Sequence, residues 1–251
     1  MNIVIPMAGA GSRFASAGYS DPKPLIRLKD IPMIRVVIEN IRPTCPHRFI
    51  FICQNEHIQS YELADKLEEW APGCEVIGID GVTDGAACTV LKAERFIDND
   101  TPLMIANSDQ YIDININQYF NFVTDRDSDG AIMTMKADDP KWSFIDVNEA
   151  SHITRVVEKE VISDEATVGI YNFAKGSDFV SAANEMIDSN LRVNNEFYVA
   201  PAYNILIGRG LKFDYFNIGS VEKGMYGLGT PSDLSHFLEH PVCGNALACF
   251  S

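Results

Sequence analysis

Two glycines, an arginine and a lysine near the amino terminus have the types and the spacing of a phosphate-binding site. Gly9 and Gly11 lack Cβ atoms, so the backbone there can take positive φ angles and turn successive N–H groups toward an anion. Arg13 adds a rigid fork of donors, and Lys23 adds a mobile positive charge. The prolines on both sides of Lys23 are expected to hold that segment extended. The sequence therefore predicts a phosphate cradle.

Two common phosphate-binding motifs do not fit this stretch. A Walker A loop has four residues between its glycines and ends in Lys-Ser or Lys-Thr, and neither feature is present. The dinucleotide-binding fingerprint requires a glycine three positions after Gly11, where Phe14 stands. A nicotinamide-dependent dehydrogenase is therefore disfavoured.

The elements that would position these residues alternate between strand and helix. The run from Ile3 to Met7 is short, apolar and followed by small residues, as expected for a buried strand that leads into a turn. This alternation predicts right-handed βαβ units on a largely parallel sheet, whose ligands bind beyond the carboxyl ends of the strands. Further strands are predicted at 48–53, 75–79 and 102–106, and helices at 31–41, 55–70 and from the 80–89 loop to residue 96.

A second candidate loop, residues 80–89, follows the third predicted strand. Its small residues Gly85 and Ala86 would allow a planar base to lie against the backbone. A plain helix start, with Thr83 or Asp84 as its N-cap, is the alternative interpretation.

An aspartate lies just after the fourth predicted strand. Asp109 could hold Mg²⁺, which prefers a carboxylate together with phosphate oxygens and water. A turn-forming aspartate is the alternative interpretation. Asp113 is expected to cap a helix over residues 114–123.

The pattern changes after residue 130. Successive strands with short polar turns indicate an inserted mixed or antiparallel lobe over one side of the cleft. These strands are predicted at 131–136, 144–147, 153–157 and 166–173, and they are followed by a helix at 179–187, a strand at 212–216 and a final helix that opens within 225–234.

The order of these motifs resembles the sugar-phosphate nucleotidyltransferases, which make nucleoside-diphosphate sugars from a nucleoside triphosphate and a phosphorylated acceptor. The resemblance rests on Gly9-x-Gly11-x-Arg13 followed by Pro-Lys-Pro-Leu at 22–25. It implies an α/β fold, a Rossmann-like (GT-A-like) three-layer sandwich with a central, mostly parallel mixed sheet and a small inserted β-rich acceptor lobe. The implied divisions are a domain at 1–240, with a nucleotide-binding half at 1–129 and an acceptor-binding half at 130–230, and a C-terminal tail at 241–251.

The resemblance also implies a role for each site residue. Arg13 would hold the departing β- and γ-phosphates, Lys23 the α-phosphate, and Asp109 a bridging Mg²⁺, which makes these three the catalytic set. Lys159 would pair with the acceptor phosphate and Glu158 with acceptor hydroxyls. The expected nucleotide-binding residues are Ala8, Gly9, Ala10, Gly11, Ser12, Arg13, Lys23, Asp84, Gly85, Ala86 and Ser108. The expected acceptor-binding residues are Glu158, Lys159, Gly169, Tyr171 and Glu196.

The chain departs from the family pattern near its last predicted helix. Many members carry an aspartate two residues before a Gly-Thr pair, where it completes the metal site, and this chain has Gly227 there. Glu222, Glu196 or Asp214 could substitute, or Asp109 could hold the metal with phosphates and water alone. A relative that binds a nucleoside triphosphate without catalysis is therefore a second interpretation.

The sequence leaves the acceptor open. A sugar 1-phosphate is the family default. The Pro-Met-Ala-Gly form of the first loop and the glycine at 227 also resemble capsule-pathway members, including the cytidylyltransferase that uses phosphoglutamine. A non-sugar phosphate is therefore the alternative acceptor, a pyrimidine base is favoured, and the implied pathway is the synthesis of surface polysaccharide precursors.

Composition limits the class of protein. The chain has 251 residues, of which 46% are hydrophobic, enough for one large domain. Its net charge of −15 excludes a general nucleic-acid surface, which needs clustered Lys and Arg. No apolar stretch approaches the roughly 20 residues that cross a bilayer, and no basic flank or cleavage-like site precedes the first strand. We expect a cytoplasmic protein without a membrane or nucleic-acid partner, and a homo-oligomer is compatible with the sequence.

The cysteines are expected to be free thiols, several of them buried. None of them forms a C-x-x-C pair, so no zinc site is expected. The six cysteines are Cys45, Cys53, Cys74, Cys88, Cys243 and Cys249.

Overall fold

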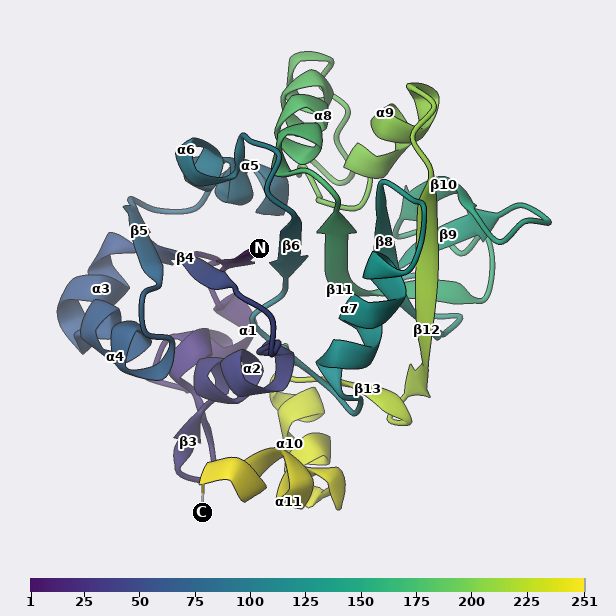
Figure 1. Cartoon of the computed structure of the whole chain (residues 1–251). Coiled ribbons are helices and arrows are strands. Elements are labelled where there is room, and N and C mark those ends of the chain that lie inside the picture. Colours follow the sequence, from purple (N-terminus) through teal and green to yellow (C-terminus); the bar gives the residue numbers. More distant parts are fainter. Residues whose placement is uncertain (251) are drawn as a thin grey trace.

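One long sheet forms the centre of the molecule, and helices cover both of its faces (Figure 1). The computed structural model describes residues 1–250. The strands are β1 (Asn2–Pro6), β4 (Arg48–Gln54), β5 (Glu75–Ile79), β6 (Leu103–Ala106), β7 (Gln110–Ile112), β8 (Gly130–Lys136), β9 (Ser143–Val147), β10 (Ile153–Glu158), β11 (Glu165–Phe173), β12 (Phe213–Val221) and β13 (Gly224–Gly227). Their order is β5-β4-β1-β6-β11-β8-β12-β13-β7, with β9 and β10 branching from β11. The short strands β2 (Arg27–Leu28) and β3 (Ile31–Pro32) pair separately.

The first half of the sheet is parallel, as the sequence predicts. β1 lies between β4 and β6 and is parallel to both, and β5 is parallel to β4. Ile3, Val4 and Ile5 are fully buried because helices cover both faces of these strands. The carboxyl ends of these strands therefore meet at one edge of the sheet.

Helices complete a three-layer arrangement, which confirms the predicted fold class. Apolar residues of α2, α4 and α7 pack against one face of the sheet, and those of α5, α6, α8 and α9 pack against the other. The helices are α1 (Ser12–Ser16), α2 (Met33–Ile41), α3 (Asn55–Tyr61), α4 (Leu63–Trp70), α5 (Ala86–Val90), α6 (Glu94–Ile97), α7 (Ile116–Thr124), α8 (Gly176–Asp188), α9 (Ala202–Gly208), α10 (Pro231–Glu239) and α11 (Val242–Leu247).

Three predictions about helices were wrong in detail. The helix expected over 55–70 is two helices, because Glu62 takes a left-handed φ of 50° between α3 and α4. The helix expected to run to residue 96 is divided into α5, a 3₁₀ turn η2 (Leu91–Ala93) and α6. Asn115, and not Asp113, caps α7, since its side chain accepts a hydrogen bond from the Asn117 N–H.

The inserted lobe is smaller than expected. β11 lies between β6 and β8 and is antiparallel to both, so β8 and β11 belong to the main sheet. All nine residues of β11 are buried, as in a central strand covered on both faces. Only β9 and β10, which pair with each other, leave the main sheet.

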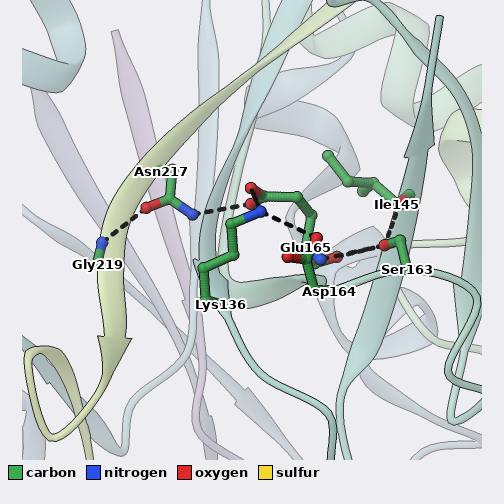
Figure 2. A network of polar contacts seen from close by, with 7 residues as sticks. All are labelled: Lys136, Ile145, Ser163, Asp164, Glu165, Asn217 and Gly219. Atoms are coloured by element: carbon green, nitrogen blue, oxygen red, sulfur yellow. Dashed lines mark hydrogen bonds and ion pairs between the residues drawn. The ribbon is translucent and has the colours of Figure 1, made fainter.

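A network of polar side chains at the start of β11 ties this small lobe to the second half of the sheet (Figure 2). The Glu165 carboxylate lies 2.7 Å from the Lys136 ammonium and accepts a hydrogen bond of 2.8 Å from the Asn217 amide. The neighbouring Ser163 hydroxyl donates to the Ile145 carbonyl at 2.6 Å. These contacts join residues of β8, β9 and β12 at the start of β11.

The carboxyl-terminal helices pack onto the start of the chain. A third apolar cluster joins α10 and α11 to Phe14, Ile26 and Leu28. The Arg35 guanidinium lies 5.8 Å from the centroid of the Trp70 ring and 5.1 Å from that of Phe250. Residues 241–250 of the predicted tail are thus docked on the domain.

Two further expectations concern membranes and cysteines. Among residues 1–250, no helix combines the length and the apolar composition that a membrane crossing requires. All six cysteines are free thiols in this part of the chain, and Cys53 and Cys243 are buried.

Candidate active site

The glycine-rich loop joins β1 to α1. Gly11 takes a left-handed φ of 61°, and a Cβ at this position would lie 3.4 Å from the Cβ of Lys23. Gly9 is not among the glycines with positive φ, so that part of the prediction was wrong. A Cβ built on Gly9 would meet no atom within 4 Å, so the loop is open to a ligand on this side.

Lys23 and Asp109 form an ion pair beyond the carboxyl ends of β1 and β6. The Lys23 Nζ lies 2.9 Å from the Asp109 Oδ2, and each side chain is 25% exposed. Lys23 begins a short 3₁₀ helix, η1 (Lys23–Leu25), and not the extended segment expected, because the Leu25 N–H donates to the Pro22 carbonyl. The lysine expected to bind phosphate and the carboxylate expected to hold metal therefore form one cluster.

The lack of a side chain at Gly229 leaves room for the Asp109 carboxylate, a contact that the sequence did not predict. A Cβ at Gly229 would lie only 2.6 Å from the Asp109 Oδ2. The N–H of Leu228 donates to the Asp109 carbonyl at 2.8 Å. The glycine of the Gly-Thr-Pro segment was visible in the sequence, but its contact with residue 109 depends on the pairing of β13 with β7.

Arg13 lies on α1 with its side chain exposed. Among residues 1–250, no hydrogen bond, ion pair or aromatic contact engages its guanidinium, so the group is available to an anion. Ser12 begins the same helix and is exposed, whereas Ser108 is buried beside Asp109. Their roles in nucleotide binding stay predictions.

A cavity of about 430 Å³ lies between the glycine-rich loop and the loop that precedes α5. Glu196, predicted on the acceptor side, lines this cavity as well. The cavity brings together six predicted nucleotide-binding residues, Ala8, Gly9, Ala10, Asp84, Gly85 and Ala86. This space, called here the nucleotide cavity, has the walls expected from the sequence.

Gly85 is required by packing against another segment of the chain. It takes a φ of 131°, and a Cβ here would lie 2.5 Å from backbone atoms of Phe197. Backbone hydrogen bonds join Phe197 to Asp84 and to Ala87, and Arg192 lies 3.2 Å from the Asp84 carboxylate. Gly85 itself is the N-cap of α5, without a side-chain cap, so neither preceding residue caps this helix. The sequence had suggested contact with a nucleotide base at this glycine, but it did not predict the packing against Phe197.

A second cavity, of about 260 Å³, contains four of the predicted acceptor-binding residues. They are Glu158, Lys159, Gly169 and Tyr171. Ala86 lines both this acceptor cavity and the nucleotide cavity, so the two spaces adjoin. Asn107, Ser143 and Tyr198 also line the acceptor cavity, and the sequence analysis did not identify them.

Gly169 allows two side-chain amides to lie on β11. Its φ is 80°, and a Cβ would lie 2.1 Å from the Asn107 Nδ2 and 3.0 Å from the Gln110 Oε1. The register of β11 against β8 shifts between Thr167 and Tyr171, where this glycine lies. The conformation of Gly169 thus lets Asn107, which directly follows β6, pack against β11 in the wall of the acceptor cavity.

Glu158 is a buried carboxylate in the acceptor cavity. Burial raises the pKa of Glu158 above its ordinary value, the nearby Glu196 charge raises it further, and the Ser143 hydrogen bond and the Lys159 charge oppose these effects. Glu158 is therefore suited to bind a hydroxyl group of the substrate. The carboxylate would accept a hydrogen bond from that hydroxyl, and the protonated carboxyl group would donate one to it.

Lys159 is one of two lysines that line the acceptor cavity, and Lys141 is the other. It takes a left-handed φ of 58°, an uncommon conformation for a residue with a side chain. Its Nζ donates to the Tyr198 hydroxyl at 2.6 Å and lies 4.7 Å from the centroid of that ring. This hydrogen bond is the main cause that raises the pKa of Lys159, which keeps the charge available to a phosphate.

The carboxylates that could replace the missing aspartate lie in different places. Asp214 is hydrogen-bonded to His152 near the start of β12, at the edge of the sheet opposite Asp109, so it is excluded. Glu222 lies 4.0 Å from His236, outside both cavities. Within residues 1–250, no group of three or more His, Cys, Asp or Glu residues is arranged to hold a metal ion. Glu196 lines the nucleotide cavity, so metal binding would depend on Asp109, with Glu196 as the remaining candidate for a second carboxylate.

Comparisons with known proteins agree with this geometry. Residues 3–197 match the family model described as nucleotidyl transferase. A mannose-1-phosphate guanyltransferase of Aspergillus fumigatus is 25% identical over 177 residues, which are 68% of this chain and 49% of that protein. The chain thus spans about half the length of the curated relatives it matches.

Two solved structures have a similar fold. A nucleoside-diphosphate-sugar pyrophosphorylase from Vibrio cholerae RC9 is 26% identical with a TM-score of 0.78, and the match covers 95% of this chain and 100% of that chain. The inositol-1-phosphate CTP transferase of T. maritima is 15% identical with a TM-score of 0.74, over 98% of this chain and 96% of that chain, and it shows the fold alone. On the strength of the family match over residues 3–197, this chain belongs to the nucleotidyl transferase family.

Proposed function

We propose that the protein transfers a nucleoside monophosphate from a nucleoside triphosphate to a phosphorylated small-molecule acceptor. An oxygen of the acceptor phosphate attacks the α-phosphorus in line. The bond from that phosphorus to the bridging oxygen of the β-phosphate breaks, and its electron pair leaves with pyrophosphate. No protein nucleophile takes part in this reaction.

Two adjoining cavities, one of them lined by Lys159, support this proposal more than any other observation. The nucleotide cavity and the acceptor cavity share Ala86, so ligands that fill them would meet at one point. Lys159 lies in the acceptor cavity, and Lys23 lies at the carboxyl ends of β1 and β6. Two phosphorylated ligands can approach closely only where such cations offset their repulsion.

Each cation has a separate part in the proposed reaction. The exposed Arg13 holds the β- and γ-phosphates, and Lys23 leaves Asp109 to bind the α-phosphate. Lys159 holds the acceptor phosphate, while Glu158 binds acceptor hydroxyls. Catalysis then comes from positioning and from charge stabilisation on the equatorial oxygens.

The residues present fit a Mg²⁺ ion as the cofactor. Asp109 offers one partly exposed carboxylate, and Mg²⁺ is commonly held by one or two carboxylates together with substrate phosphates. When bound, the ion would neutralise charge on the triphosphate. The absence of a side chain at Gly227 leaves the protein with Asp109 as the expected ligand.

A sugar 1-phosphate is the proposed acceptor, in the synthesis of surface polysaccharide precursors in the cytoplasm. The mannose-1-phosphate guanyltransferase relatives support a sugar phosphate. A non-sugar phosphate such as phosphoglutamine, with CTP as the donor, is the second candidate, and the shared fold of an inositol-1-phosphate CTP transferase is compatible with it. Neither candidate requires a nucleic-acid or membrane partner.

Pyrophosphate release tests this proposal. The assay would combine Mg²⁺ and each of CTP, UTP, dTTP, GTP and ATP with sugar 1-phosphates, phosphoglutamine and phosphocholine. Turnover by one pair would identify base and acceptor together. Triphosphate binding without turnover across the panel would instead support a binding protein, the remaining alternative.

An Asp109→Asn variant makes the assay specific to the site. We expect it to lose Mg²⁺-dependent turnover while its circular dichroism spectrum stays unchanged. Asp65→Asn, an exposed aspartate on α4, is the matched control with the same change of charge. Equal turnover by the two variants would contradict the role of Asp109.

A further inference from the structure

A third cavity, of about 380 Å³, lies outside the two cavities of the proposed reaction. It is bounded by α10, by the turn between β12 and β13, and by Lys141 and Trp142. The same two residues line the acceptor cavity, so the two spaces lie on either side of them. We call this space the α10 cavity.

Carboxylates outnumber basic side chains in the α10 cavity. Glu222, Asp233 and Glu239 line it, and Lys141 is the one Lys or Arg among the described lining residues. The Lys141 Nζ is itself 3.5 Å from a carboxylate oxygen of Asp139, which partly offsets its charge. The cavity therefore has a negative balance that favours a cationic ligand.

Two histidines in the wall do not reverse this balance. The Nδ1 of His240 accepts a hydrogen bond from the Val242 N–H at 3.2 Å, so this nitrogen is already engaged within the chain. His236 lies 4.0 Å from the Glu222 carboxylate, which would offset any charge on the imidazole.

Aromatic rings form the apolar part of the wall. Trp142, Tyr226 and Phe237 line the cavity, and the Tyr226 and Phe237 rings lie 5.8 Å apart at an angle of 65°. The Lys141 Nζ lies 5.0 Å from the centroid of the Trp142 ring, a cation–π contact that a ligand cation would replace or share. Aromatic faces together with carboxylates are the side chains that recognise organic ammonium groups.

Gly227 lines the α10 cavity without a side chain of its own. A Cβ at this position would lie 3.6 Å from the Asp233 carboxylate, so a larger side chain would enter the space beside α10. Gly227 pairs with Gln110, the neighbour of Asp109, in the β13–β7 register. The glycine that departs from the family pattern therefore lies where the cavity approaches the proposed reaction.

We propose that the α10 cavity binds an organic ammonium group, either a protonated amine or a quaternary ammonium. The cation lies against Trp142 and Tyr226 with Glu222 and Asp233 as its counter-charges. The group belongs either to the far end of the phosphorylated acceptor or to a free amine. The first of these two sources rests on the proposed function, whereas the ammonium site itself does not.

Calorimetric titration with choline tests the site directly on the whole protein without nucleotide. We expect saturable binding, and binding at least tenfold weaker for 3,3-dimethylbutan-1-ol, which has the same shape without the charge. Equal affinity for the two compounds, or no binding of choline, would overturn the proposal.

Paired variants locate the site. The Glu222→Gln/Asp233→Asn double variant should lose at least tenfold in choline affinity, and Glu222→Gln alone, at an exposed position, should lose part of it. Glu69→Gln makes the same change of charge on α4 and should leave choline binding unchanged. Equal losses in all three proteins would show that only the overall charge attracts choline, and would refute the site.

Phosphocholine distinguishes the two sources. If the acceptor carries the ammonium group, phosphocholine should bind more tightly than choline, and Lys159→Gln should remove that gain. If a free amine is the ligand, phosphocholine should bind no more tightly than choline. Choline binding without pyrophosphate release would leave this site standing and contradict only the proposed function, and the reverse result would contradict only this site.

Discussion

The nucleotide cavity and the acceptor cavity are built in opposite ways. The nucleotide cavity lies at the ends of parallel strands, and small residues such as Gly9, Gly85 and Ala86 line it. The acceptor cavity lies against the antiparallel strands β10 and β11, and its wall contains the ionisable side chains of Glu158 and Lys159. Small residues therefore expose more backbone to a ligand in the first cavity than in the second, where side chains dominate the wall. Substitutions should accordingly change acceptor choice more readily than they change triphosphate binding.

Of the substitutions considered, the removal of Lys23 should have the largest effect, and it should impair the nucleotide-binding half of the site. Lys23→Ala is expected to lower turnover by about 10²–10³-fold, because a preorganised charge at the transferred phosphoryl group is lost. The melting temperature should change little, since the Lys23–Asp109 pair is partly exposed. Pyrophosphate-release kinetics and thermal melting measure the two effects, with the exposed Lys92→Ala as control. An unfolded Lys23→Ala protein would count against this role.

Removing Lys159 should affect the acceptor half alone. Lys159→Gln is expected to raise the KM for the acceptor about tenfold, because the phosphate loses a charged hydrogen bond of roughly 1.5–3 kcal/mol. The KM for the triphosphate should stay within twofold. Steady-state kinetics with each substrate varied in turn measures the difference, and Lys175→Gln, an exposed lysine, serves as control. Equal changes in both KM values would show that the halves are not separable.

Gly85→Ala should show where the two halves are joined. The substitution places a Cβ against the Phe197 backbone at a φ of 131°, so we expect the melting temperature to fall by about 5 °C. Both KM values should rise, because Phe197 lies between Glu196 of the nucleotide cavity and Tyr198 of the acceptor cavity. Gly73→Ala is the matched control, with a φ of 79° and open space around the new Cβ. If the two variants lose equal stability, backbone strain alone explains the effect.

A Glu158→Gln variant in the acceptor cavity should differ from the parent protein in how its stability depends on pH. Burial raises the pKa of Glu158 in the folded state, so ionisation at higher pH costs stability that the neutral glutamine keeps. The melting temperature of the variant relative to the parent should therefore increase as the pH rises from about 4 to about 7. Thermal melting across this range measures the slope. A difference that shrinks with rising pH would contradict the raised pKa.

The parallel half of the fold was predictable because its strands are buried on both faces. Runs such as Phe49 to Cys53 read as uninterrupted apolar segments whatever their partners are. The extent of the lobe was not predictable, since the pattern of β11 does not reveal that it lies between β6 and β8. Glu62 shows a similar limit, because nothing in its residue type requires the left-handed angle that divides α3 from α4.

The candidate site was predictable where a motif is contiguous. Spacing within the first loop identified Gly11 and Lys23, although the ion pair of Lys23 with Asp109 depends on where β6 ends. Ser143 and Tyr198 were missed because they reach Glu158 and Lys159 only through the fold. Glu196 was predicted at the acceptor and lies in the nucleotide cavity, although its charge also reaches Glu158.

The contact between Lys23 and Asp109 means that the site supplies its own counter-ion. A charged ligand that enters must displace a bonded partner as well as water, so its binding is an ion exchange. Under the proposed function, whichever of a triphosphate or a divalent ion arrives first releases the side chain that receives the other. In a protein of net charge −15, this pairing keeps the lysine neutralised until a ligand displaces the carboxylate.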